Sequence, residues 1–205
     1  MHSAVRITLA GLLLLGVFTA KADVATGTGT LNLQVERLAS EVTLSTEQQE
    51  DVRYGGITWG LHGREVVLVQ VEPRFVDLDY GFTTRYGYSH TLQLPAGTYA
   101  LTVVGLEPRQ SYSVERQMHR AAFVNSKIRT VTIEAGKTTG IRIAPVIPDE
   151  DATKPFIPTF LTSITAPDVS FEDTDKTQRP TAISARGRSS IAWPDYRGPV
   201  KFVPR

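Results

Sequence analysis

The sequence predicts an all-β protein, in which one β-sandwich domain follows an N-terminal leader and precedes an extended tail. Three observations predict it. Apolar residues alternate with polar ones in short runs between residues 28 and 144, turn-forming residues separate these runs, and prolines accumulate after Ala144. Alternation with a period of two is typical of half-buried strands. Several short strands separated by turns favour two sheets packed face to face.

The N-terminus has the features of a secretory leader. Residues 7–20 are mostly apolar, His2 and Arg6 precede them, and small residues stand at Ala20 and Ala22. The apolar stretch is shorter than the roughly 20 residues that a helix needs to cross a bilayer. We therefore expect residues 1–22 to be a cleaved signal peptide. The mature chain is expected to have no transmembrane anchor and to be periplasmic or extracellular.

The cysteine content and the net charge indicate in which compartment the protein works and which classes of partner it binds. The chain has no cysteine, so it forms no disulfide and accepts no lipid on a cysteine. An exported domain without disulfides depends on its core, which favours a bacterial envelope. Without Arg6 and Lys21, the 22 basic residues become 20, against 21 acidic ones. A nearly neutral chain has no field that would attract nucleic acid, so no such partner is expected.

The expected sandwich domain comprises residues 23–147. Alternation occurs in residues 31–36, 92–94, 99–103, 128–133 and 141–143. Residues 66–71 are instead almost continuously apolar and mostly β-branched, which predicts a central strand covered on both faces. The turn signals are Pro-Ala-Gly at 95–97 and Glu-Ala-Gly-Lys at 134–137, and the second predicts a hairpin.

Two stretches fit the strand pattern less clearly. Ser45 and Gln48 have the spacing of a capping box, which predicts a helix over residues 45–52. The same stretch lacks an apolar stripe, so a polar loop is an equal alternative. Residues 116–124 are compatible with helix or strand, and we favour a strand.

One pair of strands resembles a known family. Residues 94–103 have the sequence Leu-Pro-Ala-Gly-Thr-Tyr-Ala-Leu-Thr-Val, and the hairpin over residues 128–143 follows. This pair resembles the strand pair of extracytoplasmic transthyretin-like and carboxypeptidase-regulatory-like sandwich domains, over about a quarter of the mature chain. The resemblance implies a Greek-key sandwich of the transthyretin or immunoglobulin type, which serves as a binding or spacer module rather than a catalyst. It transfers no functional residues to this chain.

Residues 148–205 are expected to form an extended, largely disordered tail. Prolines are frequent from Pro145 onward and hydrophobic periodicity mostly disappears. Residues 156–164 are the exception, because they are apolar enough to pack on the sandwich as an edge segment. Residues 145–175 hold seven acids and one base, whereas residues 176–205 hold seven bases and one acid. The basic half is either a solubilising tail or an arm that docks on an anionic envelope polymer or partner.

The sequence contains no recognisable catalytic or metal-binding motif. His62, His90 and His119 lack the spacing that places two imidazoles on one face of one element. There is no cysteine nucleophile and no Gly-x-Ser-x-Gly motif. Asp77 and Asp79 resemble part of a calcium loop, but the later glutamate is missing, which favours an ordinary acidic loop. We therefore expect a non-enzymatic protein without metal or cofactor; a hydrolase with an unrecognised site is an alternative.

Residues 74–90 are the most informative stretch for function. Five aromatic side chains stand there among arginines and aspartates. Rings beside charged groups are typical of protein-binding and sugar-binding surfaces. The alternative is that alternate rings face the core. The candidate binding residues, which include one tryptophan from a glycine-flanked segment, are Trp59, Arg74, Tyr80, Arg85, Tyr86 and Tyr88.

These observations predict a bacterial envelope module that binds a protein partner. The contact is expected through an exposed strand edge or through residues 74–90. A carbohydrate-binding accessory domain that stacks sugars on Trp59, Tyr80, Tyr86 and Tyr88 is the alternative.

Overall fold

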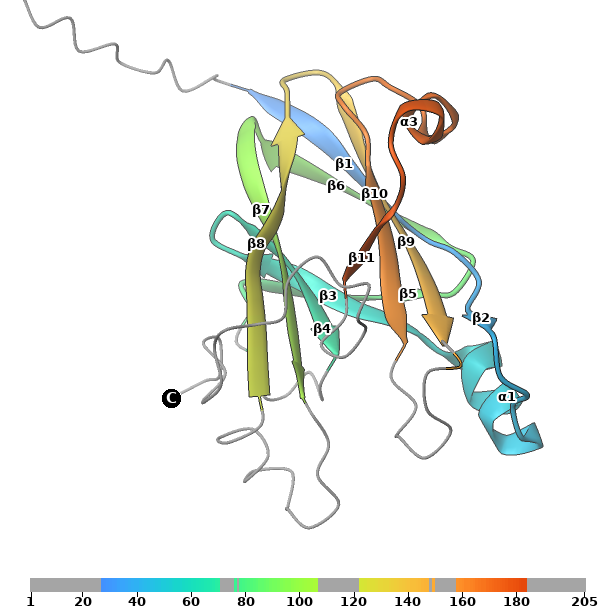
Figure 1. The fold of residues 1–205 in the computed structure, drawn as a ribbon. Coiled ribbons are helices and arrows are strands. Elements are labelled where there is room, and N and C mark those ends of the chain that lie inside the picture. The colour runs from blue at the N-terminus through green and yellow to red at the C-terminus, as the bar shows by residue number, and fades with distance from the viewer. Residues whose placement is uncertain are drawn as a thin grey trace, which may run out of the picture.

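The protein consists of two β-sheets that pack face to face (Figure 1), which confirms the all-β prediction. The computed structural model describes residues 27–70, 76, 78–106, 122–147, 149 and 158–183. The expected signal peptide, Arg74, Asp77, His119 and the rest of residues 116–121 lie outside these residues, as do residues 148, 150–157 and 184–205.

The first sheet has the strand order β11-β10-β9-β1-β6, with the short β2 also paired to β9. β1 is antiparallel to β6 and parallel to β9. The strands of this sheet are β1 (Thr28–Val35), β2 (Ala39–Ser40), β6 (Ser89–Pro95), β9 (Thr138–Ile147), β10 (Thr159–Ile164) and β11 (Thr181–Ile183).

The second sheet has the strand order β5-β3-β4-β7-β8. Its central strand β4 is antiparallel to β3 and parallel to β7. The strands are β3 (Gly56–His62), β4 (Glu65–Gln70), β5 (Tyr80–Arg85), β7 (Gly97–Leu106) and β8 (Ala122–Ile133). Residues 66–69 of β4 are buried on both faces, as their continuous apolar sequence predicts. β8 also confirms a strand for residues 122–124.

The core lies between the two sheets and explains the alternation in the sequence. In β1, Leu31, Leu33 and Val35 are fully buried while the residues between them are partly exposed. Leu68 and Leu101 face them from the second sheet as members of the same apolar cluster. The period of two therefore reports which side of each strand faces the other sheet.

The stretch that begins at Ser45 is a helix and not a loop, because α1 spans Thr46–Tyr54. The Gln48 N–H donates to the Ser45 hydroxyl at 3.2 Å, and the Ser45 N–H donates to Gln48 Oε1 at 2.9 Å, so both bonds of the capping box form. No residue of α1 is buried, which explains why its sequence has no apolar stripe. The cap therefore specifies this helix more than packing does.

The expectation of a tail beginning at residue 148 is wrong for residues 158–183. β10 pairs with β9, and β11 pairs with the other side of β10. Phe160, Ile164 and Ile183 belong to the core cluster. The apolar segment therefore packs on the sandwich as expected, but β11 rather than β10 forms the edge. Short elements separated by prolines leave too few residues for a periodic signal.

α3 (Phe171–Thr177) covers the outer face of the first sheet, at the opposite end of the molecule from α1 (Figure 1). The Phe171 ring packs directly against Gly140 of β9. A Cβ atom at position 140 would clash with this ring. The Arg142 guanidinium lies 4.9 Å from the Phe171 ring centroid and pairs with Glu36 at 3.3 Å and with Asp175. Neither described helix is long and apolar enough to cross a membrane.

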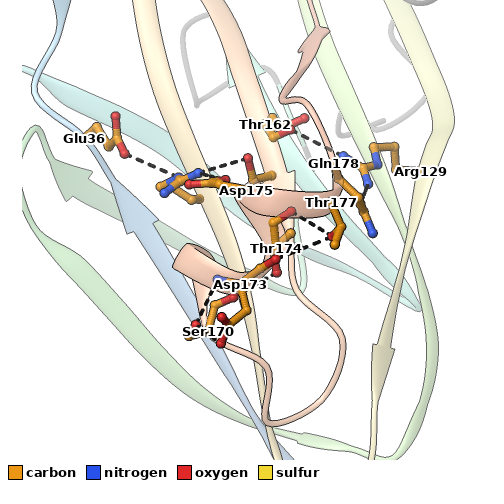
Figure 2. Close-up of polar contacts among 11 residues, drawn as sticks. Glu36, Arg129, Thr162, Ser170, Asp173, Thr174, Asp175, Thr177 and Gln178 are labelled. Carbon is orange, nitrogen blue, oxygen red and sulfur yellow. Dashed lines mark hydrogen bonds and ion pairs between the residues drawn. The ribbon is translucent and has the colours of Figure 1, made fainter.

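Arg129 of β8 joins the two sheets at one edge of the sandwich (Figure 2). It donates at 3.3 Å to the Thr162 carbonyl, the Thr181 hydroxyl and Gln178 Oε1. Burial lowers the pKa of Arg129 from its ordinary value. The segment 158–183 is thus bonded to both sheets.

Candidate functional site

Trp59 does not belong to an exposed binding surface, contrary to the sequence-based expectation. It points inward from β3 and its side chain is 0% exposed. Its indole N–H donates to the Thr84 hydroxyl at 2.9 Å, and its ring centroid lies 4.8 Å from that of Phe82. The glycine at position 60 suggested a loop, but Gly60 lies within β3, where Leu78 and the Tyr80 carbonyl leave no space for a side chain.

The tyrosines of residues 74–90 do not form one surface. Tyr80 begins β5, whereas Tyr86 and Tyr88 follow the end of that strand, and a six-residue strand is roughly 17 Å long. Tyr80 and Tyr88 are each 65% exposed. Tyr86 packs against Gly55, and burial raises the pKa of its phenol. Exposed Arg85 lies at the Tyr86 end, and Arg74 lies outside the described residues.

A cleft of about 540 Å³ opens where β5 and β6 diverge. The two strands are joined by the turn at residues 86–88 but belong to different sheets. Near this turn, His90 closes the space between the strands, with its ring centroid 4.6 Å from that of Phe82. Farther from the turn, the first half of β5 and the second half of β6 form the walls. Among the described binding candidates from the sequence, Tyr80 lies at the cleft.

The floor of the cleft is apolar. Leu61 and Leu94 are buried there, and Phe82 and Leu92 are partly buried against the core. These side chains point inward from β3, β5 and β6, as the alternation of their strands requires. The cleft is therefore an opening of the core at the margin of the sandwich.

Polar groups surround one end of the cleft. Arg64, in the turn between β3 and β4, donates from Nη1 to the Ala96 carbonyl at 3.4 Å. Its guanidinium lies 5.5 Å from the ring centroid of Tyr99, whose hydroxyl donates to the Pro95 carbonyl at 3.0 Å. Burial raises the pKa of the Tyr99 phenol, and the charge of Arg64 partly opposes this. Asp79 accepts the Gly63 N–H at 2.6 Å.

Along the side that borders the cleft, the backbone of β6 has no partner strand among the described residues. The Val35 N–H donates to the Tyr88 carbonyl, and the Ala96 N–H donates to the Gly27 carbonyl, each at 2.9 Å. In an antiparallel pair, every second residue bonds to the partner strand. The even-numbered positions of β6 therefore face β1, whereas the peptide groups of Ser89, Thr91 and Gln93 point outward. β6 ends its sheet among the described strands.

The described residues contain no group of three or more His, Asp or Glu side chains that could hold a metal ion. What the site offers is an apolar cavity, a row of outward N–H and C=O groups, and one cation. This combination can bind an extended chain, with its backbone on β6 and alternate side chains in the cleft.

Sequence reasoning missed Arg64, Gln93 and the leucines of the floor. Gly63, whose φ is +56°, marks a turn at Arg64. However, no local pattern predicts that this turn lies over Tyr99, 35 positions later in the sequence. That proximity arises because β4 pairs with β7 in parallel.

No protein-family model matches the chain, and no curated protein or solved structure is significantly similar to it.

Proposed function

We propose that this protein is a non-enzymatic binding module of the bacterial envelope and that it engages an extended segment of a protein partner at the edge of β6. The observation that supports the proposal is the unpaired backbone of Ser89, Thr91 and Gln93 beside the cleft. A segment added there extends the first sheet by one strand. Its inward side chains then fill the cleft above Phe82 and Leu92.

The proposal includes an exported protein with a Greek-key, transthyretin-like sandwich. Two face-to-face sheets support the sandwich. The motif that resembles the family covers residues 94–103, which here form the end of β6, the turn beside the cleft and the first part of β7. The parallel pairs β1–β9, β2–β9 and β4–β7 depart from a simple array of antiparallel hairpins, and the Greek-key order remains a prediction.

A carbohydrate ligand is the second candidate. The exposed Tyr80 ring, with Asp79 and Gln93 in the same cleft, offers one stacking platform beside polar groups. Burial removes Trp59 from the expected set of platforms, and Tyr88 lies at the far end of β5. One exposed ring supports a carbohydrate ligand less strongly than the free strand edge of β6 supports a peptide ligand.

Replacing Thr91 by proline tests strand addition. Proline has no N–H, and the N–H of Thr91 points away from β1, so Thr91→Pro removes a donor from the free edge without removing a bond of the sheet. Displayed random peptides would be selected on the wild-type chain, and synthetic copies would be titrated against each variant. We expect Thr91→Pro to weaken binding roughly tenfold, through the lost bond and the bulk of the ring at the edge.

The controls are Thr91→Val, which keeps the N–H, and Thr83→Pro, which removes an outward N–H from the edge of β5 instead. Both are expected to bind like the wild type, and circular dichroism would verify that each variant is folded. Equal affinity of Thr91→Pro and wild type would refute addition at β6. Loss of affinity in Thr83→Pro alone would move the contact to β5.

A further inference from the structure

Arg64 lies at the end of the cleft, and the described residues use only a small part of its hydrogen-bonding capacity. Of its five guanidinium N–H groups, one contacts the Ala96 carbonyl, at the long distance of 3.4 Å. No described carboxylate lies within ion-pairing distance of it: the acid nearest in the sequence, Glu65, accepts the Thr102 hydroxyl, and Asp79 accepts the Gly63 N–H. The remaining N–H groups of the guanidinium can therefore donate hydrogen bonds to a bound anion.

Arg64 is an exposed residue, but its guanidinium has defined contacts with the turn beside the cleft. The Nη1 atom of Arg64 lies 1.9 Å from the place that a Cβ atom on residue 97 would take, so it packs closely against the backbone of Gly97. Gly97 also has a φ of +143°, which other residues avoid. The Tyr99 ring supports the guanidinium from β7. The side chain is thus packed against the backbone and a ring before any ligand arrives, which lowers the entropic cost of binding.

The free edge of β6 ends beside this cation. The next outward position after Gln93 is Pro95, which has no N–H to continue a ladder, and the Pro95 carbonyl accepts the Tyr99 hydroxyl. A bound strand therefore loses its backbone partners at the point where Arg64 stands, so a charged group at the end of the bound segment is well placed there.

From these observations we infer that the partner segment presents a carboxylate, which pairs with Arg64 at the Pro95 end of the cleft. The inference rests on the proposed function and names the chemistry of its ligand. The carboxylate is either an Asp or Glu side chain or the free C-terminus of the partner. The carboxylate of Asp79 lies at the same end of the cleft and repels the carboxylate of the ligand, so the charge of Asp79 lowers the affinity.

The first test compares synthetic copies of the selected peptides on wild type, Arg64→Gln and Asp79→Asn. We expect Arg64→Gln to weaken binding roughly tenfold or more. Asp79→Asn keeps an oxygen that accepts the Gly63 N–H, and it should bind equally well or tighter. Amidation of the peptide C-terminus and replacement of its Asp and Glu by Asn and Gln show which carboxylate is used.

Peptides that bind Arg64→Gln as tightly as wild type, yet lose affinity on Thr91→Pro, would overturn the carboxylate pairing and leave strand addition standing. Equal weakening by Arg64→Gln and Asp79→Asn would also overturn it, because removal of opposite charges should not act alike.

A second test requires no selected peptide. Acetate would be titrated into the full-length chain while the arginine side-chain N–H resonances are followed by NMR, with chloride as the salt control. We expect the Arg64 resonance to shift and to saturate at lower acetate concentration than that of Arg85, which is exposed like Arg64 but lies outside the cleft. Parallel responses of the two arginines would overturn the inference even if no peptide is ever selected.

Discussion

At the scale of single residues, the aromatic residues Trp59 and Tyr80 differ in exposure although their sequence surroundings are alike. Both stand in glycine-containing stretches and both were expected at a binding surface. Trp59 faces the core from β3, while Tyr80 lies where β5 reaches the margin of the sandwich and stays 65% exposed. Their exposure differs because Trp59 lies in the middle of β3, between β4 and β5, whereas Tyr80 is the first residue of the edge strand β5.

The buried bond of Trp59 gives a prediction at this scale. Thr84→Val removes the acceptor of the indole N–H with little change of shape, which leaves a buried donor unsatisfied. We expect the free energy of unfolding to fall by about 1–3 kcal/mol, measured by urea denaturation.

Thr83→Val is the matched control, because Thr83 is the exposed neighbour on the same strand. It should change stability by no more than about 0.5 kcal/mol. Similar effects of the two substitutions would show that the loss reflects strand propensity rather than the indole bond.

At the scale of elements, α1 and β4 show opposite origins of secondary structure. β4 is specified by burial, since residues 66–69 are covered on both faces at the centre of their sheet. α1 buries nothing and depends on its cap. A helix of nine residues without packing is marginal in water, so local bonds at its N-terminus matter more than usual.

Ser45→Ala tests this dependence. The substitution removes the side chain that accepts the Gln48 N–H. We expect a local loss of about 1 kcal/mol, which makes the α1 amides exchange with solvent roughly fivefold faster. Hydrogen exchange followed by NMR measures it.

Because no residue of α1 is buried, the midpoint of global thermal unfolding should stay nearly unchanged. Thr43→Ala, an exposed change just before the cap, is the control and should leave α1 exchange as it is. A large drop in the global midpoint for Ser45→Ala would contradict a locally stabilised helix.

At the scale of the whole molecule, the sandwich extends beyond β9 through residues 158–183. β10 and β11 complete the first sheet, α3 covers its outer face, and Arg129 ties this region to the second sheet. Residues that the composition assigned to a tail therefore contribute Phe160, Ile164 and Ile183 to the same hydrophobic core, and we expect them to unfold together with the rest of the sandwich.

Ile183→Ala tests that cooperativity. Ile183 is 0% exposed and ends the last described strand. The substitution opens a cavity in the shared core and should lower the global stability by about 2–5 kcal/mol in a single unfolding transition.

Val169→Ala, in the same segment but with a 40% exposed side chain, should cost no more than about 0.5 kcal/mol. Indistinguishable stabilities of Ile183→Ala and wild type would mean that this region does not contribute to the core in solution.

The sequence by itself determined the features that depend on neighbouring residues: the alternating strands, the doubly buried β4 and the turn at residues 95–97, while the spacing of Ser45 and Gln48 offered a helix and a loop as equal alternatives. Periodicity and capping report local geometry, so one strand or one helix is enough to display them. It could not determine which strands end a sheet, that Trp59 is buried and Tyr80 exposed, or that residues 158–183 join the core. Only the tertiary structure decided these, and with them the cleft beside β6, because strand order and burial arise from contacts between residues far apart in the chain.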